Sequence, residues 1–263
     1  MNEVYLNTLQ LGSTGNPILM LHGWGQTLES LQPLGELLAF EAQVHLLDLP
    51  GFGSSALPDG GWDTNQYADH ILRYMDEQGL EQVDLLGHSF GGRVAIRLAS
   101  RYPNRVRSLV LINSAGLQRH RSLLQWIRIK LIKWLRVFFS LIPVFGSRLK
   151  EWHTNRFGSR DYKNAGSLRG TLVKTVNEDL TSDASQIQAS TLLIWGELDT
   201  ETPLEIGIRL HRLIPHSKFI ELPGRDHFLF RNEGSHLCAY YVLQLLREVS
   251  KPAPIHQQHL SHV

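Results

Sequence analysis

The sequence has little that would point to a secreted protein or to a nucleic-acid-binding one. Cys238 is the single cysteine among 263 residues, so no disulfide can form within the chain, as is usual in a reducing compartment. The formal net charge is only +1, which provides no overall attraction to nucleic acid. Residues 1–15 lack the basic start and the continuous apolar run of a signal peptide. We therefore expect a cytoplasmic protein with no nucleic-acid partner.

Short apolar runs alternate along the chain with longer segments of helical periodicity. The apolar character of the runs predicts strands that are buried on both faces, as in a parallel sheet. These strands cover residues 17–21, 44–47, 83–86, 109–112, 192–195 and 219–222, and residues 4–11 are a weaker candidate for an antiparallel edge. The predicted helices cover residues 28–40, 65–78, 91–101, 204–213 and 235–249. This alternation predicts an α/β fold with a doubly wound, mostly parallel sheet, whose ligand site lies at the carboxyl ends of the strands.

One long segment interrupts the alternation. Residues 116–180 contain no convincing strand, and we expect them to form a helical cap over the strand ends. The core would then consist of residues 1–115 and 181–250, as one domain. Residues 251–263 contain two prolines and no apolar period, which predicts disorder. The three histidines of this tail have no cysteine or acidic companions there, so no metal site is predicted.

A single hydroxyl interrupts the third apolar run, in the sequence GHSFG at residues 87–91. A buried strand that turns sharply into a helix would hold Ser89 in a strained position, where the helix amides and dipole favour a developing negative charge. Gly87 and Gly91 would keep the space beside the turn clear. An ordinary serine at the start of a helix would give the same pattern, so the motif alone leaves both readings open.

A serine hydroxyl is a poor nucleophile unless a base takes its proton, and the base needs an acid to orient it. Asp199 and His227 each follow one of the last two predicted strands, so both would lie at the same edge of the sheet as Ser89. The chain order Ser, Asp, His is that of a nucleophile elbow. Glu197 and Asp226 are rival acids, although Asp226 adjoins the histidine and is expected to pair locally or to cap the next helix.

Four segments in order resemble the α/β-hydrolase family: HGWG at residues 22–25, DLPGFGSS at residues 48–55, the GHSFG turn, and the segments with the acid and the histidine. The resemblance covers residues 4–250, and the cap is its least specific part. It implies an α/β-hydrolase core with an inserted cap. We interpret residues 48–55 as loop structure.

The resemblance also implies roles for individual residues. Ser89 would be the nucleophile, His227 the general base and then the general acid, and Asp199 the carboxylate that orients the histidine. Asp199 is favoured over Glu197 because it stands where the family has its acid. This chemistry requires no metal and no organic cofactor.

An oxyanion needs two hydrogen-bond donors. The resemblance implies that the backbone amides of Phe90 and Trp24 supply them. We expect Trp24 to wall the substrate pocket. His88 would line the elbow in a mainly structural role, and we also count it among the substrate-binding residues. His22 would hold its loop by hydrogen bonds.

The serine at the centre of the elbow disfavours the family's dehalogenases and epoxide hydrolases, which have an aspartate there. Esterases, thioesterases, amidases and carbon–carbon bond hydrolases remain. We expect an ester hydrolase that acts on a small, largely apolar acyl substrate. A carbon–carbon bond hydrolase of the same fold and a ligand-binding receptor with little turnover are the alternatives.

The cap segment is strongly basic. Residues 119–150 contain eight Lys or Arg and no Asp or Glu, and residues 123–142 place an apolar stripe opposite most of these charges. Four basic residues within residues 123–142 argue against a transmembrane span. We expect a lid helix over the pocket mouth. Peripheral contact of its basic face with an anionic membrane or with an acidic carrier protein is the further possibility.

Overall fold

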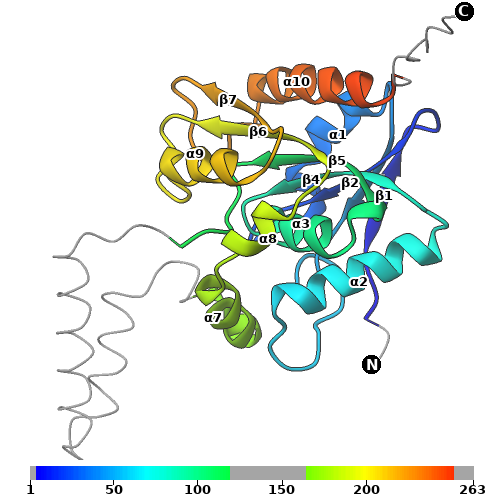
Figure 1. The fold of residues 1–263 in the computed structure, drawn as a ribbon. Coiled ribbons are helices and arrows are strands. Elements are labelled where there is room, and N and C mark those ends of the chain that lie inside the picture. The colour runs from blue at the N-terminus through cyan, green and yellow to red at the C-terminus, as the bar shows by residue number, and fades with distance from the viewer. Residues whose placement is uncertain (1–3, 119–163, 252–263) are drawn as a thin grey trace, which may run out of the picture.

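The computed structural model describes residues 4–118 and 164–251 (Figure 1). Its centre is a seven-stranded sheet of order β1-β3-β2-β4-β5-β6-β7. Only β1 is antiparallel to its neighbour, and all other strand pairs are parallel. The strands are β1 Thr8–Leu11, β2 Pro17–Leu21, β3 Gln43–Leu47, β4 Val83–His88, β5 Val106–Ile112, β6 Ser190–Gly196 and β7 Lys218–Leu222. The predicted α/β fold with a mostly parallel sheet is confirmed.

The apolar runs form strands because side chains that alternate along them enter two different cores. In β2, Leu19 and Leu21 belong to one apolar cluster, whereas Ile18 and Met20 belong to the cluster on the other face. All four side chains are completely buried. A strand with both faces covered needs apolar residues at every position, and this is why the periodicity of two is hidden in the sequence.

Helices cover both faces of the sheet (Figure 1). Helices α1 and α10 pack on one face, and α2, α3, α8 and α9 pack on the other. Their bounds are α1 Gln32–Leu38, α2 Thr64–Glu77, α3 Phe90–Arg101, α7 Arg169–Asn177, α8 Thr181–Ser185, α9 Leu204–Leu213 and α10 Glu233–Val249. The continuous helix expected over residues 28–40 is wrong, because a 3-10 turn at Leu28–Ser30 precedes α1. Pro33 has no amide hydrogen and is tolerated only in the first turn of the helix.

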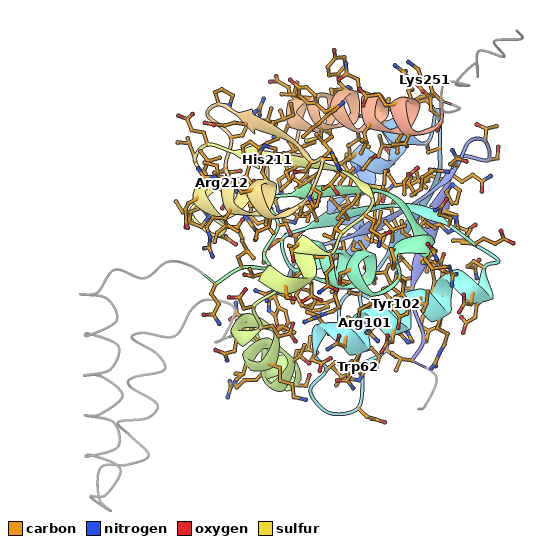
Figure 2. All side chains as sticks on the ribbon, in the orientation of Figure 1. Trp62, Arg101, Tyr102, His211, Arg212 and Lys251 are labelled. Carbon is orange, nitrogen blue, oxygen red and sulfur yellow. The ribbon has the colours of Figure 1, made fainter. Side chains whose placement is uncertain are left out.

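Local polar contacts fix the start of α2 and its contact with α3. Asp63 accepts from the Gln66 amide at 3.0 Å, and the Gln66 side chain accepts from the Asp63 amide at 3.1 Å, which forms a capping box. Arg101 and Tyr102, at the end of α3 (Figure 2), reach the Asp69 carboxylate of α2 at 2.8 and 2.6 Å. The helix bearing the elbow is thereby tied to its neighbour.

The two described ends of the segment between β5 and β6 meet beside α3. The Leu180 amide donates to the Gly116 carbonyl at 2.9 Å, and Arg97 of α3 pairs with Asp183 of α8 at 2.5 Å. Among the described residues of this segment before Leu180, a 3-10 turn spans Gly166–Leu168 and is followed by α7. The expected lid helix and its basic face lie outside the described residues, as does the tail 252–263. Along the parts of the chain that the structure describes, no helix has the length and apolar character needed to cross a membrane.

Candidate active site

Ser89 occupies a strained turn between β4 and α3. Its φ of 50° and ψ of −111° lie in a region that a residue with a side chain rarely adopts. The surrounding backbone holds this conformation, because the Ser89 amide donates to the Ile112 carbonyl at 3.2 Å and the Ala115 amide donates to the Ser89 carbonyl at 3.0 Å. The side chain is half-buried. The turn therefore has the geometry that the GHSFG sequence predicts.

The two glycines of the turn are required by close backbone contacts. A Cβ atom at Gly91 would lie 2.2 Å from the carbonyl oxygen of Leu21 in β2, and one at Gly87 would lie 2.6 Å from the Gly91 carbonyl oxygen. The first helical turn thus packs directly on the neighbouring strand. This confirms that larger side chains would clash on both sides of the serine.

Asp199 and His227 form a buried hydrogen-bonded pair at the carboxyl edge of the sheet. His227 Nδ1 lies 2.8 Å from Asp199 Oδ2, and both residues are at least nine-tenths buried. The second carboxylate oxygen accepts from the amides of Glu201 and Thr202, each at 2.8 Å, and the Thr202 hydroxyl donates to Oδ2 at 2.7 Å. These donors offset the cost of burying the carboxylate. The negative charge is placed where it can hold the Nδ1–H tautomer of the imidazole.

The rival acids occupy other positions. Glu197 is exposed and accepts from the Gly224 amide at 2.9 Å. Asp226 is also exposed and accepts from the Phe228 amide at 2.9 Å, so it closes a local turn and does not cap the next helix. The carboxylate that contacts His227 Nδ1 is therefore that of Asp199.

The elbow and the histidine loop are in direct contact. The ring of His88 lies 4.8 Å from that of His227, centroid to centroid, and His88 Nε2 donates to the His227 carbonyl at 3.0 Å. Within the described part of the chain, no hydrogen bond joins Ser89 Oγ to the imidazole. His227 Nε2 instead lies 3.4 Å from the exposed carboxylate of Glu201. The hydrogen bond between a catalytic serine and its histidine is commonly long in the absence of substrate and tightens when substrate binds.

His88 is completely buried, so its expected contact with substrate is wrong, whereas the structural role expected for it fits the structure. Neighbouring residues of a strand point to opposite faces, and the His88 ring is completely buried behind the elbow against Phe230, at 4.7 Å between centroids. Burial and the nearby charge of His227 hold the pKa of His88 well below its ordinary value. The neutral ring keeps Nδ1 as an acceptor toward the Gln26 amide, 3.4 Å away. His88 therefore has a structural role.

The HGWG loop is held as predicted by its histidine. His22 Nδ1 donates to the Gly23 carbonyl at 2.8 Å, and His22 Nε2 accepts from the Leu49 amide at 2.9 Å. Burial lowers the pKa of His22 to about 4. The partly buried Trp24 ring packs edge-on against Phe90 at 5.3 Å, so the two residues with the predicted oxyanion amides are neighbours.

The loop at residues 48–55 is structural, as expected. One Asp48 carboxylate oxygen accepts from the Leu28 amide at 2.7 Å and the other accepts from the Ser54 amide at 2.9 Å. Ser55 Oγ donates to the Asp48 carbonyl at 2.6 Å. This loop thereby supports the 3-10 turn that follows the HGWG segment.

Sequence reasoning missed two buried polar residues at this edge. Thr202 contacts the Asp199 carboxylate, and Asn113 bonds to the loops of both the acid and the histidine. Asn113 directly follows β5, and Asp199 and His227 lie in the loops that follow β6 and β7. A polar residue immediately after a predicted parallel strand was the signal that could have found it.

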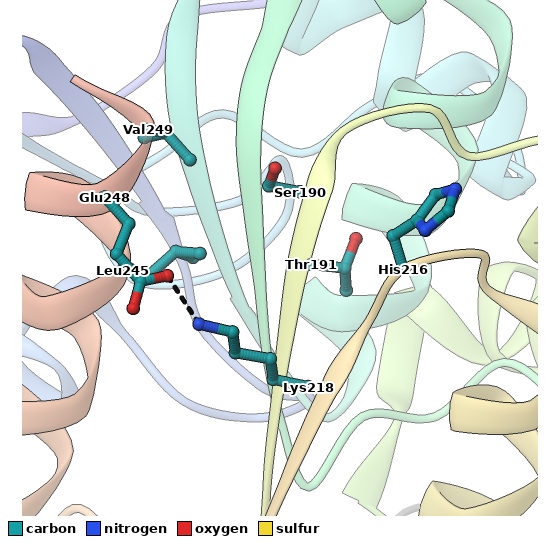
Figure 3. Close-up of a pocket in the computed structure, with 7 residues that line it drawn as sticks. All are labelled: Ser190, Thr191, His216, Lys218, Leu245, Glu248 and Val249. Atoms are coloured by element: carbon teal, nitrogen blue, oxygen red, sulfur yellow. Dashed lines mark hydrogen bonds and ion pairs between the residues drawn. The ribbon is translucent and has the colours of Figure 1, made fainter. Parts of the chain in front are cut away.

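A separate hollow of about 180 Å³ lies at the opposite, amino end of β6 and β7 (Figure 3). Ser190 and Lys218, the first residues of the two strands, line it, and Lys218 forms an ion pair with Glu248 of α10. Because the acid and the histidine follow the other ends of these strands, this hollow is not part of the candidate site.

The sequence and the fold of this chain are similar to those of known hydrolases. Residues 16–139 match the model of a family described as the alpha/beta hydrolase fold. The chain is 29% identical over 234 residues to a pimeloyl-[acyl-carrier protein] methyl ester esterase of Shewanella woodyi. The aligned region covers 82% of this chain and 88% of that protein. The chain is also 40% identical over 106 residues to a 2-hydroxymuconate semialdehyde hydrolase of Pseudomonas sp. strain CF600. That aligned region covers 39% of this chain and 38% of the hydrolase. A meta-cleavage product hydrolase of Pseudomonas fluorescens has the same fold, with a TM-score of 0.70 at 23% identity over 93% of this chain and 95% of the other.

Proposed function

Because the chain belongs to the α/β-hydrolase family and is a hydrolase, we propose that it is a serine esterase that cleaves a small, largely apolar acyl ester. The residues that would carry the reaction are Ser89, His227 and Asp199. The observation that carries the proposal is the buried contact of 2.8 Å between His227 Nδ1 and Asp199, at the same sheet edge as the strained serine. A histidine oriented in this way next to a nucleophile elbow has the form of a proton-transfer site.

In the proposed acylation step, Ser89 Oγ attacks the ester carbonyl carbon while its proton passes to His227 Nε2. The imidazolium that forms is stabilised by Asp199, which accepts the Nδ1 hydrogen bond and keeps its own charge. The tetrahedral intermediate collapses when His227 donates that proton to the leaving alkoxide. The alcohol departs and the acyl group remains on the serine as an ester.

In the proposed deacylation step, His227 takes a proton from water, and the hydroxide oxygen attacks the acyl-enzyme carbonyl carbon. Collapse of the second intermediate returns the proton to Ser89 Oγ and releases the carboxylic acid. In both steps the oxyanion would accept hydrogen bonds from the amides of Phe90 and Trp24. The amide of Phe90 begins α3, where the helix dipole also favours negative charge.

The partner that fits the basic cap best is an acidic carrier protein. Residues 119–150 have eight basic and no acidic residues, and the relative from Shewanella woodyi is named for an ester linked to an acyl-carrier protein. Attraction between the basic cap and an acidic carrier would accelerate their association, and salt would screen this attraction. We expect a carrier-linked methyl ester to be hydrolysed faster than the same ester without its carrier, with an advantage that disappears at high salt. Equal rates at low salt would remove the carrier from the proposal.

A carbon–carbon bond hydrolase is the second candidate, because the 2-hydroxymuconate semialdehyde hydrolase matches part of this chain. The esterase relative matches about twice as much of the chain, and this favours the ester. Turnover of a p-nitrophenyl ester panel of graded acyl length, measured beside a vinylogous diketone, distinguishes the two. Tight binding with one slow turnover would favour a receptor.

The nucleophile is tested with a fluorophosphonate probe. Wild type should be labelled at Ser89, and Ser89→Ala should not be labelled and should lose ester hydrolysis. Ser235→Ala is the control, since Ser235 is a serine near the start of another helix, is buried and is assigned no chemistry. Labelling of Ser89→Ala at the wild-type rate would refute the proposed nucleophile.

A further inference from the structure

We infer that Asn113 is a positioning residue that holds the loop of the acid and the loop of the histidine in register with the elbow. The inference rests on the proposed function, because it concerns the same site. Asn113 follows β5, the strand between the nucleophile strand β4 and the acid strand β6. It therefore stands between the two halves of the site, and its side chain is completely buried.

The side-chain amide of Asn113 bonds to the histidine loop with both of its hydrogens. Asn113 Nδ2 donates to the backbone carbonyls of Asp226 and His227, each at 2.9 Å. The His227 carbonyl also accepts from His88 Nε2. Two buried donors, one from the elbow and one from β5, thus fix the backbone that carries the catalytic imidazole.

The same residue bonds to the acid loop through two oxygens. Asn113 Oδ1 accepts from the Gly196 amide at the end of β6, at 2.9 Å. The single hydrogen of the Thr202 hydroxyl is shared between the Asn113 carbonyl, at 2.9 Å, and Asp199 Oδ2, at 2.7 Å. The position of the carboxylate is therefore coupled to Asn113 on one side and to His227 on the other.

The side-chain bonds of Asn113 hold its backbone in a conformation that residues with a side chain rarely adopt. Its φ is 42°, in the left-handed region that asparagine tolerates better than most residues with a side chain. Asparagine also has two donors and one acceptor on a short side chain, and here all three are used. Aspartate has the same shape but would present a second oxygen to the two carbonyls, and glycine would accept the backbone without making any of the side-chain bonds.

The test compares Asn113→Gly and Asn113→Asp with wild type in ester hydrolysis and in the NMR signal of the imidazole Nδ1 proton. Asn113→Gly removes all side-chain bonds without backbone strain, and Asn113→Asp at pH 8 keeps only the acceptor toward Gly196. Displacement of reacting groups by about 1 Å costs roughly 100-fold, so we expect kcat to fall about 100-fold in both variants while KM changes less than about threefold. The Nδ1 proton signal should shift or broaden.

Ser108→Ala is the matched control for loss of a buried hydrogen bond. Ser108 lies in β5, the strand that Asn113 follows, at the end away from the site. It is completely buried and donates to Asp84. This variant should keep the wild-type kcat and the wild-type Nδ1 signal. Loss of kcat in Ser108→Ala equal to that in the Asn113 variants would overturn the inference, because any buried polar loss would then have the same effect.

The coupling through Thr202 provides a second test that leaves the Asn113 side chain intact. Thr202→Val deletes the hydroxyl between the Asn113 carbonyl and Asp199, and should lower kcat about tenfold, whereas Thr202→Ser should restore it. Wild-type kcat in Thr202→Val, or in either folded Asn113 variant, overturns the inference. An inactive Ser89→Ala beside fully active Asn113 variants refutes the positioning role alone, whereas an active Ser89→Ala refutes the proposed function.

Discussion

Replacing His22 by glutamine should flatten the dependence of stability on pH below neutrality. His22 is completely buried, its Nδ1 donates to the Gly23 carbonyl and its Nε2 accepts from the Leu49 amide. A second proton would have to sit on Nε2, facing an N–H donor. Burial lowers the pKa from 6.5 to about 4, so the ring stays neutral in the folded protein through most of the acidic range.

The sign and size of the effect follow from proton linkage. The unfolded chain has an ordinary histidine that binds a proton as the pH falls through 6.5, whereas the folded chain does not bind it until about pH 4. Stability is therefore lost as the pH falls between these two values, and it is fully present above 6.5. Between pH 7 and pH 5 the loss from His22 is about 2 kcal/mol.

The measurement is urea denaturation of wild type and His22→Gln at pH 7 and at pH 5. Only the difference between the two pH values is compared, so the cost of the substitution itself cancels. Glutamine can accept from the Leu49 amide and does not titrate, and the pH-dependent loss should therefore shrink by about 2 kcal/mol. His236→Gln is the control, because His236 is exposed. If His22→Gln keeps the wild-type loss within about 0.5 kcal/mol, the buried neutral histidine is not the cause.

Three further substitutions test the site. Gly91→Ala places a Cβ atom 2.2 Å from a backbone oxygen of β2, so the free energy of unfolding should fall by more than about 3 kcal/mol in urea denaturation; unchanged stability would contradict the close packing of the elbow. Asp199→Asn should lower kcat about 10⁴-fold with the fold intact by circular dichroism, whereas the exposed Glu197→Gln should keep wild-type kcat; the reverse result would exchange the two acids. Glu201→Gln removes a charge 3.4 Å from His227 Nε2 and should raise kcat/KM for an anionic monoester about threefold relative to a matched neutral ester; an unchanged ratio would show that this charge does not act on the substrate.

The local features of the site were predictable because each depends on a few neighbouring residues. The GHSFG turn needs a strand before it, a helix after it and glycines on both sides, and all of these can be recognised in sequence. The loop-holding role of His22 follows from the same kind of local pattern. The start of α1 was harder, since the effect of Pro33 on a helix depends on whether it falls in the first turn.

The contacts between distant segments could not be predicted in this way. His88 adjoins Ser89 in sequence, yet strand geometry turns its ring toward the opposite face and buries it behind His227. Asn113 carries no motif, and its importance follows only from the convergence of β5, β6 and the histidine loop. A parallel sheet predicts that these loops share one edge, but the sequence does not state which side chains form hydrogen bonds across it.

The amino-acid sequence alone determined the α/β class, the strand order along the chain, the strained serine turn and the candidate residues at the strand ends, because apolar periodicity and turn chemistry act over short distances. The tertiary structure decided that Asp199, not Glu197 or Asp226, reaches the histidine. It also placed Asn113 between the acid and histidine loops. Those choices depend on how segments more than 80 residues apart pack together, and only the folded sheet edge brings their polar groups within hydrogen-bonding distance.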